Sequence, residues 1–523
     1  MSMTGRFVSL ILLCIAVTAC TEKPQIRIGD SLVRGEPLED SQVVVFRGIG
    51  FAEPPLGELR WQKPVPAETV TQFGDTNQFA PACMQSMRIL DWYRGLAETF
   101  GASRDVFDDL TTSEDCLYLN IWSPNLKPDS TLPVMVYIHG GSNKSGWSYE
   151  PNYRGHVLAD GGAVIVSIAY RLGVFGFLSH PDLNDSAAVA NFALWDQIAA
   201  LNWIQENIQL FGGDPHKVTL FGESSGAQNI LALMASGDAT GLFHGAILQS
   251  TAGFGDGRSS LLADEQQRGV ETAQLFGFNG PDSLQKLRSV PAADLLSEYE
   301  ENFSDYYHSP AVDGQLLDEP VWDVIIGNNL ANIPLIIGSN ADEWYDSIAE
   351  DSTAEDVKKA VESSSRLNSP AALEAVADES DHREALDRIL TAEAMLCPSQ
   401  YLAVNQNDLN IDAWVYHFSR VRDGLAGSNA RAYHGAELPY VFGTHDSWMT
   451  TTEVDWRLSD NMVAYWLQFA KTGNPNSSDL PKWPTFGTGT GKVMNFSNEP
   501  TLESAPDPVL CDVFRRSVGQ EAG

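Results

Sequence analysis

The stretch KVTLFGESSG, residues 217–226, decides the fold of this chain. Its first half, Lys217 to Phe221, has the β-rich character of a short buried strand, and a helix-compatible run follows from Gln228 to Met234. Between them lies Gly222-Glu223-Ser224-Ser225-Gly226, in which a serine at a tight strand-to-helix turn has glycine neighbours without bulk. Such a turn presents a hydroxyl at a helix N-terminus, so the sequence predicts that Ser224 is a nucleophile.

Other apolar runs place this turn in a larger α/β chain. They alternate with amphipathic segments such as 191–210, which predicts a large, mostly parallel central sheet with helices on both faces. Two polar regions, 256–310 and 351–395, are predicted to be helical insertions over the sheet. No linker-like segment divides residues 31–515, which we expect to form a single domain. The predicted strands are 132–138, 163–169, 217–221, 245–248, 333–337 and 414–418.

A serine hydroxyl needs a base, and the base needs an acid that orients it. Six histidines follow Ser224 in the chain. His434 lies in a loop-like stretch, whereas His417 lies inside a predicted strand and is expected to be packed. Asp342 and Glu343 both follow the predicted strand 333–337, and the residues alone do not decide between these two carboxylates.

Backbone N–H donors for an oxyanion are predicted in two places. The segment His139-Gly140-Gly141-Ser142 follows a predicted buried strand, and its small residues allow main-chain amides to approach a reacting carbonyl. The N–H of Ser225, directly after the nucleophile, is the other predicted donor.

Composition restricts the possible partners. The 523 residues include 69 Asp plus Glu against 33 Lys plus Arg, a formal net charge of −36. Such an acidic surface repels phosphate backbones and anionic headgroups, so we expect no nucleic-acid partner. No CxxC motif or Cys/His cluster indicates a metal, and no cofactor is expected.

The N-terminus predicts export. Residues 1–19 have an early cation and a short apolar run, as in a secretory signal. Val17-Thr18-Ala19-Cys20 resembles a bacterial lipobox, which predicts a lipidated Cys20 followed by a tether over 20–30; ordinary cleavage nearby is the alternative. The expected location is the bacterial cell envelope, as an outer-membrane lipoprotein that contacts the membrane only through its anchor, and otherwise the periplasm or the medium.

Four further cysteines, Cys83, Cys116, Cys397 and Cys511, fit an oxidising compartment. They allow two disulfides in three possible pairings, or free buried thiols. Their spacing does not choose among these arrangements.

Taken together, the motifs resemble those of the type-B carboxylesterases, the cholinesterase/carboxylesterase family, over residues 26–512. The resemblance implies an α/β-hydrolase fold and hydrolysis of small carboxylic esters through an acyl-enzyme. An amidase or thioesterase with the same triad, or a non-catalytic adhesion module, are the alternatives. The resemblance is carried by residues 46–61, EDCLYLN at 114–120, FGGDP at 211–215, GESSG at 222–226, GSNADE at 338–343, His434-Gly435 and KTGNPN at 471–476.

The same resemblance implies roles for individual residues. The acid falls on Glu343 rather than Asp342, and the base falls on His434. The oxyanion donors fall on Gly141, Ser142 and Ser225. The implied disulfides are Cys83–Cys116 and Cys397–Cys511.

The chain departs from the family pattern near the expected site. Ser142 stands where a third glycine is common, Ser225 replaces the commoner alanine, and Trp344 stands where a glycine usually follows the acid. Trp344, Trp147 and Phe254 are possible pocket walls, although ordinary packing explains each equally well. Glu223 is expected either to favour the imidazolium by its negative charge or to make a structural hydrogen bond.

Overall fold

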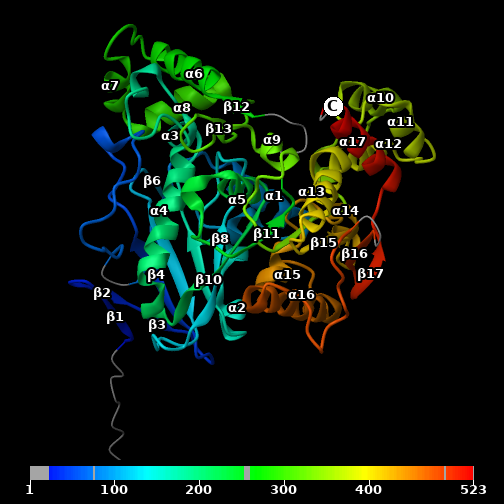
Figure 1. The fold of residues 1–523 in the computed structure, drawn as a ribbon, viewed down its shortest axis with the longest axis horizontal. Helices are drawn as coiled ribbons and strands as arrows, with labels where there is room; N and C mark the ends of the chain where they lie inside the picture. The colour runs from blue at the N-terminus through cyan, green and yellow to red at the C-terminus, as the bar shows by residue number, and fades with distance from the viewer. Residues whose placement is uncertain (1–22, 75–76, 252–258, 488–490, 522–523) are drawn as a thin grey trace, which may run out of the picture.

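The computed structural model describes residues 23–74, 77–251, 259–487 and 491–521. Its centre is an 11-stranded sheet in the order β17-β16-β15-β14-β11-β10-β8-β9-β7-β4-β3 (Figure 1). The strands are β3 (Glu36–Pro37), β4 (Val44–Gly50), β7 (Tyr118–Ser123), β8 (Leu132–Ile138), β9 (Val164–Ile168), β10 (Gly213–Glu223), β11 (Gly245–Gln249), β14 (Leu335–Asn340), β15 (Ala413–Phe418), β16 (Lys492–Phe496) and β17 (Pro500–Ser504).

The sheet is parallel in its centre and antiparallel at both edges. Every neighbouring pair from β9 through β8, β10, β11, β14 and β15 to β16 is parallel. The pairs β7·β9, β4·β7, β3·β4 and β16·β17 are antiparallel. The prediction of a large, mostly parallel sheet is confirmed, and the carboxyl ends of β8, β10 and β14 lie at the same edge.

Helices cover both faces of this sheet (Figure 1). Some of them contact the central strands directly. Helix α5 contacts β10 and β11, and helix α16 contacts β8 and β10. The helices are α1 (Arg88–Thr99), α2 (His156–Asp160), α3 (Gly173–Phe177), α4 (Phe192–Asn207), α5 (Ser225–Ala235), α6 (Leu262–Leu275), α7 (Ser283–Arg288), α8 (Ala292–Phe303), α9 (Val321–Ile326), α10 (Ala354–Ser363), α11 (Pro370–Ala375), α12 (His382–Thr391), α13 (Cys397–Asp408), α14 (Leu425–Ala430), α15 (Leu438–Phe442), α16 (Glu453–Thr472) and α17 (Pro508–Glu521).

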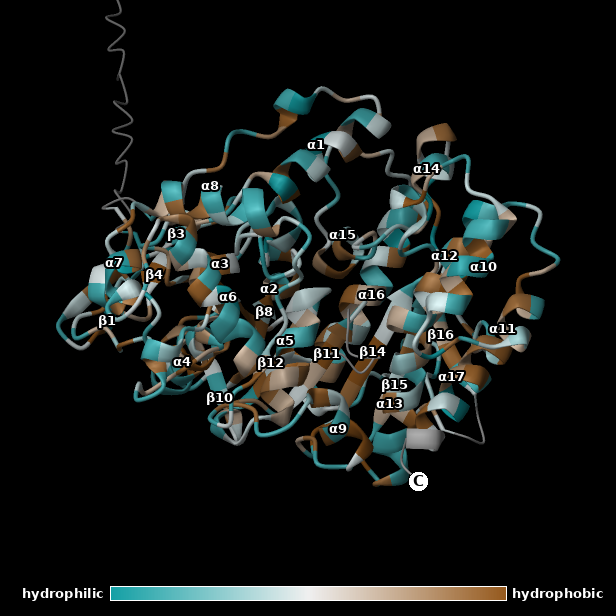
Figure 2. Cartoon of the chain, turned by 90° about the horizontal axis from the view of Figure 1, so that it is seen from above, coloured by the Kyte–Doolittle hydropathy of each residue, from teal (hydrophilic) through white to brown (hydrophobic). Residues whose placement is uncertain are grey.

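Strand β8 shows why the central strands are apolar throughout. Val134 and Val136 point into one hydrophobic core, while Met135 and Tyr137, one residue along, point into a second core on the other face. A strand buried on both faces has no solvent side, so its sequence, LPVMVYI, lacks polar alternation. The interior strands β11 and β14 are accordingly hydrophobic in Figure 2, whereas hydrophilic residues predominate on α1.

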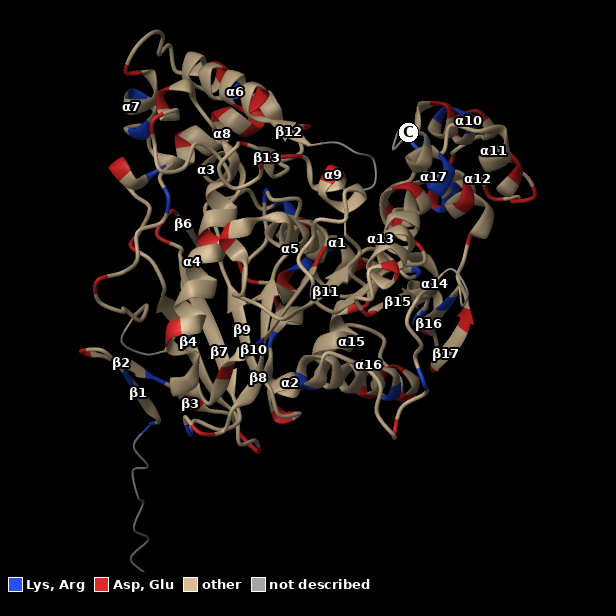
Figure 3. Cartoon of the chain, viewed as in Figure 1, with Lys and Arg blue, Asp and Glu red and all other residues tan. Residues whose placement is uncertain are grey.

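The two predicted insertions are helical, as expected. Region 256–310 contains α6, α7 and α8, and region 351–395 contains α10, α11 and α12. Both groups lie at the periphery of the fold, and acidic residues are prominent on α6 and α8 (Figure 3). Three two-stranded pairs complete the described structure: β1 (Gln25–Ile28) with β2 (Ser31–Arg34), β5 (Ala82–Cys83) with β6 (Thr112–Ser113), and β12 (Ser260–Leu261) with β13 (Ala311–Val312).

Elements at both chain ends cross the predicted boundaries. Strand β1 lies inside the predicted tether 20–30, where residues 25–28 pair with β2. At the other end, α17 continues past residue 515 to Glu521. The predicted signal 1–19 and Cys20 lie outside the described residues. Within the described ranges, no helix combines the length and apolar character that a membrane crossing needs.

Two disulfides tie distant segments together. Cys83 is bonded to Cys116, and Cys397 in α13 is bonded to Cys511 in α17. This is the pairing that the family resemblance implies. The second bond closes the longer loop, with a sequence separation of 114 residues against 33 for the first.

Candidate active site

Ser224 lies at the turn between β10 and α5 in a strained backbone conformation. Its φ of 56° and ψ of −126° are unusual for a residue with a side chain and cost on the order of 1–3 kcal/mol. The turn is held because Ser224 N–H donates to Gln249 O over 2.9 Å. A Cβ at Gly226 would lie 2.1 Å from Ile138 O, so the close approach of β8 to this turn requires a glycine there.

Glu343 and His434 are brought together by the loops that follow β14 and β15. Glu343 Oε2 lies 2.6 Å from His434 Nδ1, and Glu343 Oε1 accepts a hydrogen bond from Asn340 N–H over 2.7 Å. The carboxylate is 1% exposed. Asp342 points elsewhere, accepting hydrogen bonds from Arg431 Nη1 and from the N–H of Ala432, each over 3.1 Å. The structure therefore distinguishes two carboxylates that the sequence pattern leaves equivalent.

Glu223, beside the nucleophile, reaches the other nitrogen of the same ring. His434 Nε2 lies 3.0 Å from Glu223 Oε1, and this oxygen has no aligned hydrogen-bond donor among the described residues. The contact is therefore electrostatic. Burial raises the pKa of Glu223 to about 8, although His434 opposes the shift. Burial lowers the pKa of His434, but Glu223 and Glu343 outweigh it and raise that pKa to about 10.

The loop after β8 packs directly against this cluster. A Cβ at Gly140 would lie 2.7 Å from Glu223 Oε2 and 3.0 Å from Ser224 Cβ. Gly141 has a φ of 107°, and a Cβ there would lie 1.9 Å from Ser145 O. Ser142 follows with a φ of 60°. Gly140 and Gly141 therefore let the main chain of this loop approach Glu223, Ser224 and Ser145 more closely than residues with a Cβ could.

These features find a match among known proteins. A scan against protein families matches the Carboxylesterase family over residues 22–513. The chain belongs to the carboxylesterase family. It is accordingly a serine hydrolase that cleaves carboxylic esters, on an α/β-hydrolase fold.

Individual relatives cover nearly the whole carboxylesterase chain. The para-nitrobenzyl esterase of Bacillus subtilis (strain 168) is 35% identical over 482 residues, covering 88% of this chain and 93% of the relative. The fumonisin B1 esterase of Sphingopyxis macrogoltabida is 31% identical, covering 93% and 89%. A solved structure of a PNB esterase aligns with a TM-score of 0.79 at 32% identity, covering 94% of this chain and 99% of that one.

The sequence analysis did not identify the side chains that hold the loop after β8 and the neighbouring strand ends in place. The N–H of Asn143 donates to Ser225 Oγ over 3.0 Å, and Asn143 Oδ1 accepts from Asn229 Nδ2 over 2.9 Å. A further network links Glu437 to the ends of β14 and β11, because it accepts hydrogen bonds from Asn340 Nδ2 over 2.7 Å and from Gln249 Nε2 over 2.9 Å. No local motif marks these residues, because their partners are 82 to 188 positions away.

The predicted pocket walls fall in different places. The Trp344 ring lies nearly parallel to that of His434, with centroids 5.9 Å apart and an interplanar angle of 10°. Trp147 is instead packed in a separate aromatic cluster against Tyr93. Phe254 lies outside the described residues.

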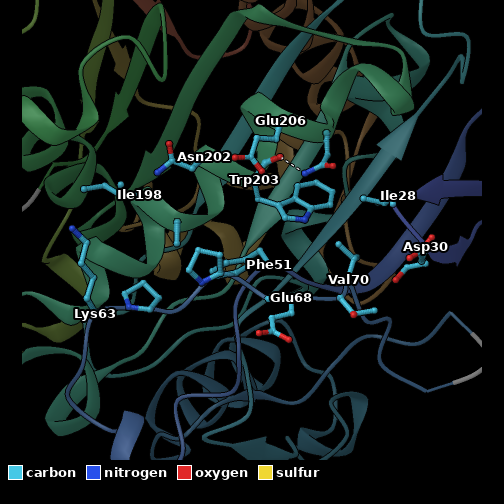
Figure 4. A pocket seen from close by; sticks show the side chains of 18 of the residues that line it. Ile28, Asp30, Phe51, Lys63, Glu68, Val70, Ile198, Asn202, Trp203 and Glu206 are labelled. Atoms are coloured by element: carbon cyan, nitrogen blue, oxygen red, sulfur yellow. Dashed lines mark hydrogen bonds between the residues drawn. The ribbon is translucent and has the colours of Figure 1, made fainter. Parts of the chain in front are cut away.

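A pocket of about 700 Å³ lies away from these residues, between the β1–β2 hairpin, the segment 63–70 and α4 (Figure 4). Phe51, Trp203 and Ile198 contribute to its apolar lining, and none of the predicted site residues lines it. Among the described residues, no group of three or more His, Cys, Asp or Glu side chains is arranged to hold a metal ion.

Proposed function

We propose that the carboxylesterase uses Ser224 as nucleophile, His434 as general base and Glu343 as the acid that orients the base. The observation that carries this proposal is the 2.6 Å contact between Glu343 Oε2 and His434 Nδ1. With Nδ1 engaged, Nε2 is the nitrogen left to take a proton. Nε2 lies 3.0 Å from the side chain of Glu223, the residue before the strained Ser224.

In the first half-reaction, Ser224 Oγ bonds to the ester carbonyl carbon and its proton passes to His434 Nε2. The tetrahedral oxyanion accepts hydrogen bonds from the N–H groups of Gly141, Ser142 and Ser225. The carbon–oxygen bond to the alcohol then breaks, and the leaving oxygen takes the proton from Nε2. Water repeats the sequence on the acyl-enzyme, releasing the carboxylic acid and restoring the serine hydroxyl.

The decisive variant is Ser224→Ala, which removes only the attacking oxygen. We expect hydrolysis of p-nitrophenyl butyrate to fall to background and labelling by a fluorophosphonate probe to disappear. Ser399→Ala is the matched control, since it removes a buried hydroxyl in α13 that bonds Met395 O. If Ser224→Ala retained most of the activity, the proposed nucleophile would be wrong.

We also propose that the exported protein is anchored by a lipid on Cys20. The two disulfides support export, because such bonds persist in oxidising compartments. The lipobox-like sequence before Cys20 supports the anchor. Cys20→Ser should release the protein from the membrane fraction of a bacterial host and abolish incorporation of labelled fatty acid, whereas Cys14→Ser should do neither.

A further inference from the structure

A second, smaller cavity lies beside the loop that carries the proposed oxyanion donors. Its volume is about 150 Å³, and Lys144, two residues after Ser142, is part of its wall. Two residues of backbone span about 7 Å at most, so the Cα atom of Lys144 lies within that distance of the Cα atom of the donor Ser142. The cavity is lined by Ser86, Arg88, Lys144, Gly173, Val174, Leu296, Tyr299, Glu300, Phe303, Ser304 and His308.

Two cations share this cavity in a strongly acidic chain. Among the described residues, neither Lys144 nor Arg88 has a carboxylate within 4.0 Å. Lys144 is half-buried; burial lowers its pKa, and the positive charge of Arg88 lowers it further. Glu300 and Asp305 oppose that shift from a longer distance. A bound anion between Lys144 and Arg88 would offset the cost of burying the Lys144 charge and would reduce the repulsion between the two cations.

We propose that this cavity is a subsite for a carboxylate carried by the ester substrate, as in a monoester of a dicarboxylic acid. Lys144 and Arg88 bind the carboxylate. The inference deepens the proposed function and rests on it, because the subsite is positioned by the same loop as the oxyanion donors. Asn143, between the donor Ser142 and Lys144, joins the two sites by donating from Nδ2 to His308 O over 2.9 Å.

A purely structural role for Lys144 gives a different expectation. Its Nζ donates to Ser304 O over 2.5 Å, linking the loop to the end of α8. If that link alone mattered, its removal would disturb the loop and slow every ester alike. A subsite instead affects anionic esters more than neutral ones, and through KM more than kcat.

The test compares mono-p-nitrophenyl glutarate with p-nitrophenyl butyrate on the full chain. For Lys144→Gln we expect the ratio of kcat/KM for the glutarate to that for the butyrate to fall about tenfold, mainly through KM. Arg88→Gln should lower the ratio in the same direction, and Lys144→Glu should lower it further. Lys127→Gln, an exposed lysine before β8, makes the same change in net charge and should leave the ratio unaltered.

The outcomes separate this inference from the proposed function. If wild-type protein hydrolyses the butyrate but not the glutarate, or if Lys144→Gln slows both esters equally, the carboxylate subsite is refuted and the proposed function stands. If Ser224→Ala hydrolyses both esters as fast as wild type, the proposed function fails instead.

Discussion

The backbone N–H of Asn143 donates to Ser225 Oγ over 3.0 Å, which fastens the loop after β8 to the residue that follows the proposed nucleophile. Both residues are fully buried. Asn229 holds the Asn143 side chain from α5, so the contact belongs to a small network. The family pattern commonly has alanine where Ser225 stands, and only the backbone of this residue is needed as an oxyanion donor. The hydroxyl therefore adds a positioning contact.

We predict that Ser225→Ala lowers both kcat and stability. The change leaves the buried N–H of Asn143 without its acceptor, which costs about 1–3 kcal/mol in the free energy of unfolding. A loop displaced relative to Ser224 should also reduce kcat by about tenfold. Steady-state kinetics and urea denaturation measure the two effects. Ser399→Ala should lower stability without changing kcat, and a fully active Ser225→Ala would show that the hydroxyl positions nothing.

We predict that Glu343→Gln lowers kcat by about 10³- to 10⁴-fold, because an amide neither stabilises the imidazolium nor fixes the ring as a carboxylate does. Asp342→Asn is the matched control. Asp342 contacts Arg431 and the N–H of Ala432, so its loss should reduce thermal stability and change kcat by less than about tenfold. The measurement is kcat on p-nitrophenyl butyrate for both variants. Similar losses of kcat in the two variants would contradict the assignment of Glu343 as the acid.

The features of this structure that the sequence predicts are those whose residues lie close together in the chain. The strands β8 and β15 were predictable because their residues are largely apolar on both faces. For β10 only the apolar segment 217–221 was predicted, and the strand begins earlier, at Gly213, with the more polar residues GDPHK. The elbow at Ser224 was predictable because its glycines, strand and helix are contiguous. The choice between Asp342 and Glu343 required the family resemblance, since adjacent side chains point in opposite directions only after the loop at 431–434 folds against them. The partners of Asn143 are likewise set by packing between distant segments.

We predict that Glu223→Gln moves the acidic limb of the kcat/KM profile to lower pH. The imidazolium form of His434 cannot accept the serine proton, so activity is lost as pH falls through the pKa of His434. Glu223 lies 3.0 Å from Nε2 and helps raise that pKa to about 10. Removing its negative charge should lower the midpoint by about one pH unit or more. A pH profile with p-nitrophenyl butyrate measures the shift, and an unchanged or higher midpoint would show that Glu223 does not stabilise the imidazolium.

Trp344 offers a test of acyl-size selection. Its ring lies parallel to that of His434 at a centroid distance of 5.9 Å, so it occupies space next to the proposed base. Its backbone N–H donates to Asp387 Oδ1 over 2.8 Å, a contact that side-chain replacement leaves intact. Trp344→Ala should therefore open the site without releasing the loop. We expect kcat/KM for branched or aromatic acyl esters to rise about tenfold relative to acetate, since small volume differences in a pocket change selectivity by that order.

The control for this prediction is Trp147→Ala, because Trp147 packs against Tyr93 in a separate aromatic cluster. That variant should lose stability, measured by thermal denaturation, while its preference among acyl groups stays that of the wild type. Trp344→Phe should give an intermediate preference, since the smaller ring still fills part of the same space. If Trp344→Ala and Trp147→Ala changed the preference equally, the effect would come from general loosening of the fold, and Trp344 would have no specific part in selecting the acyl group.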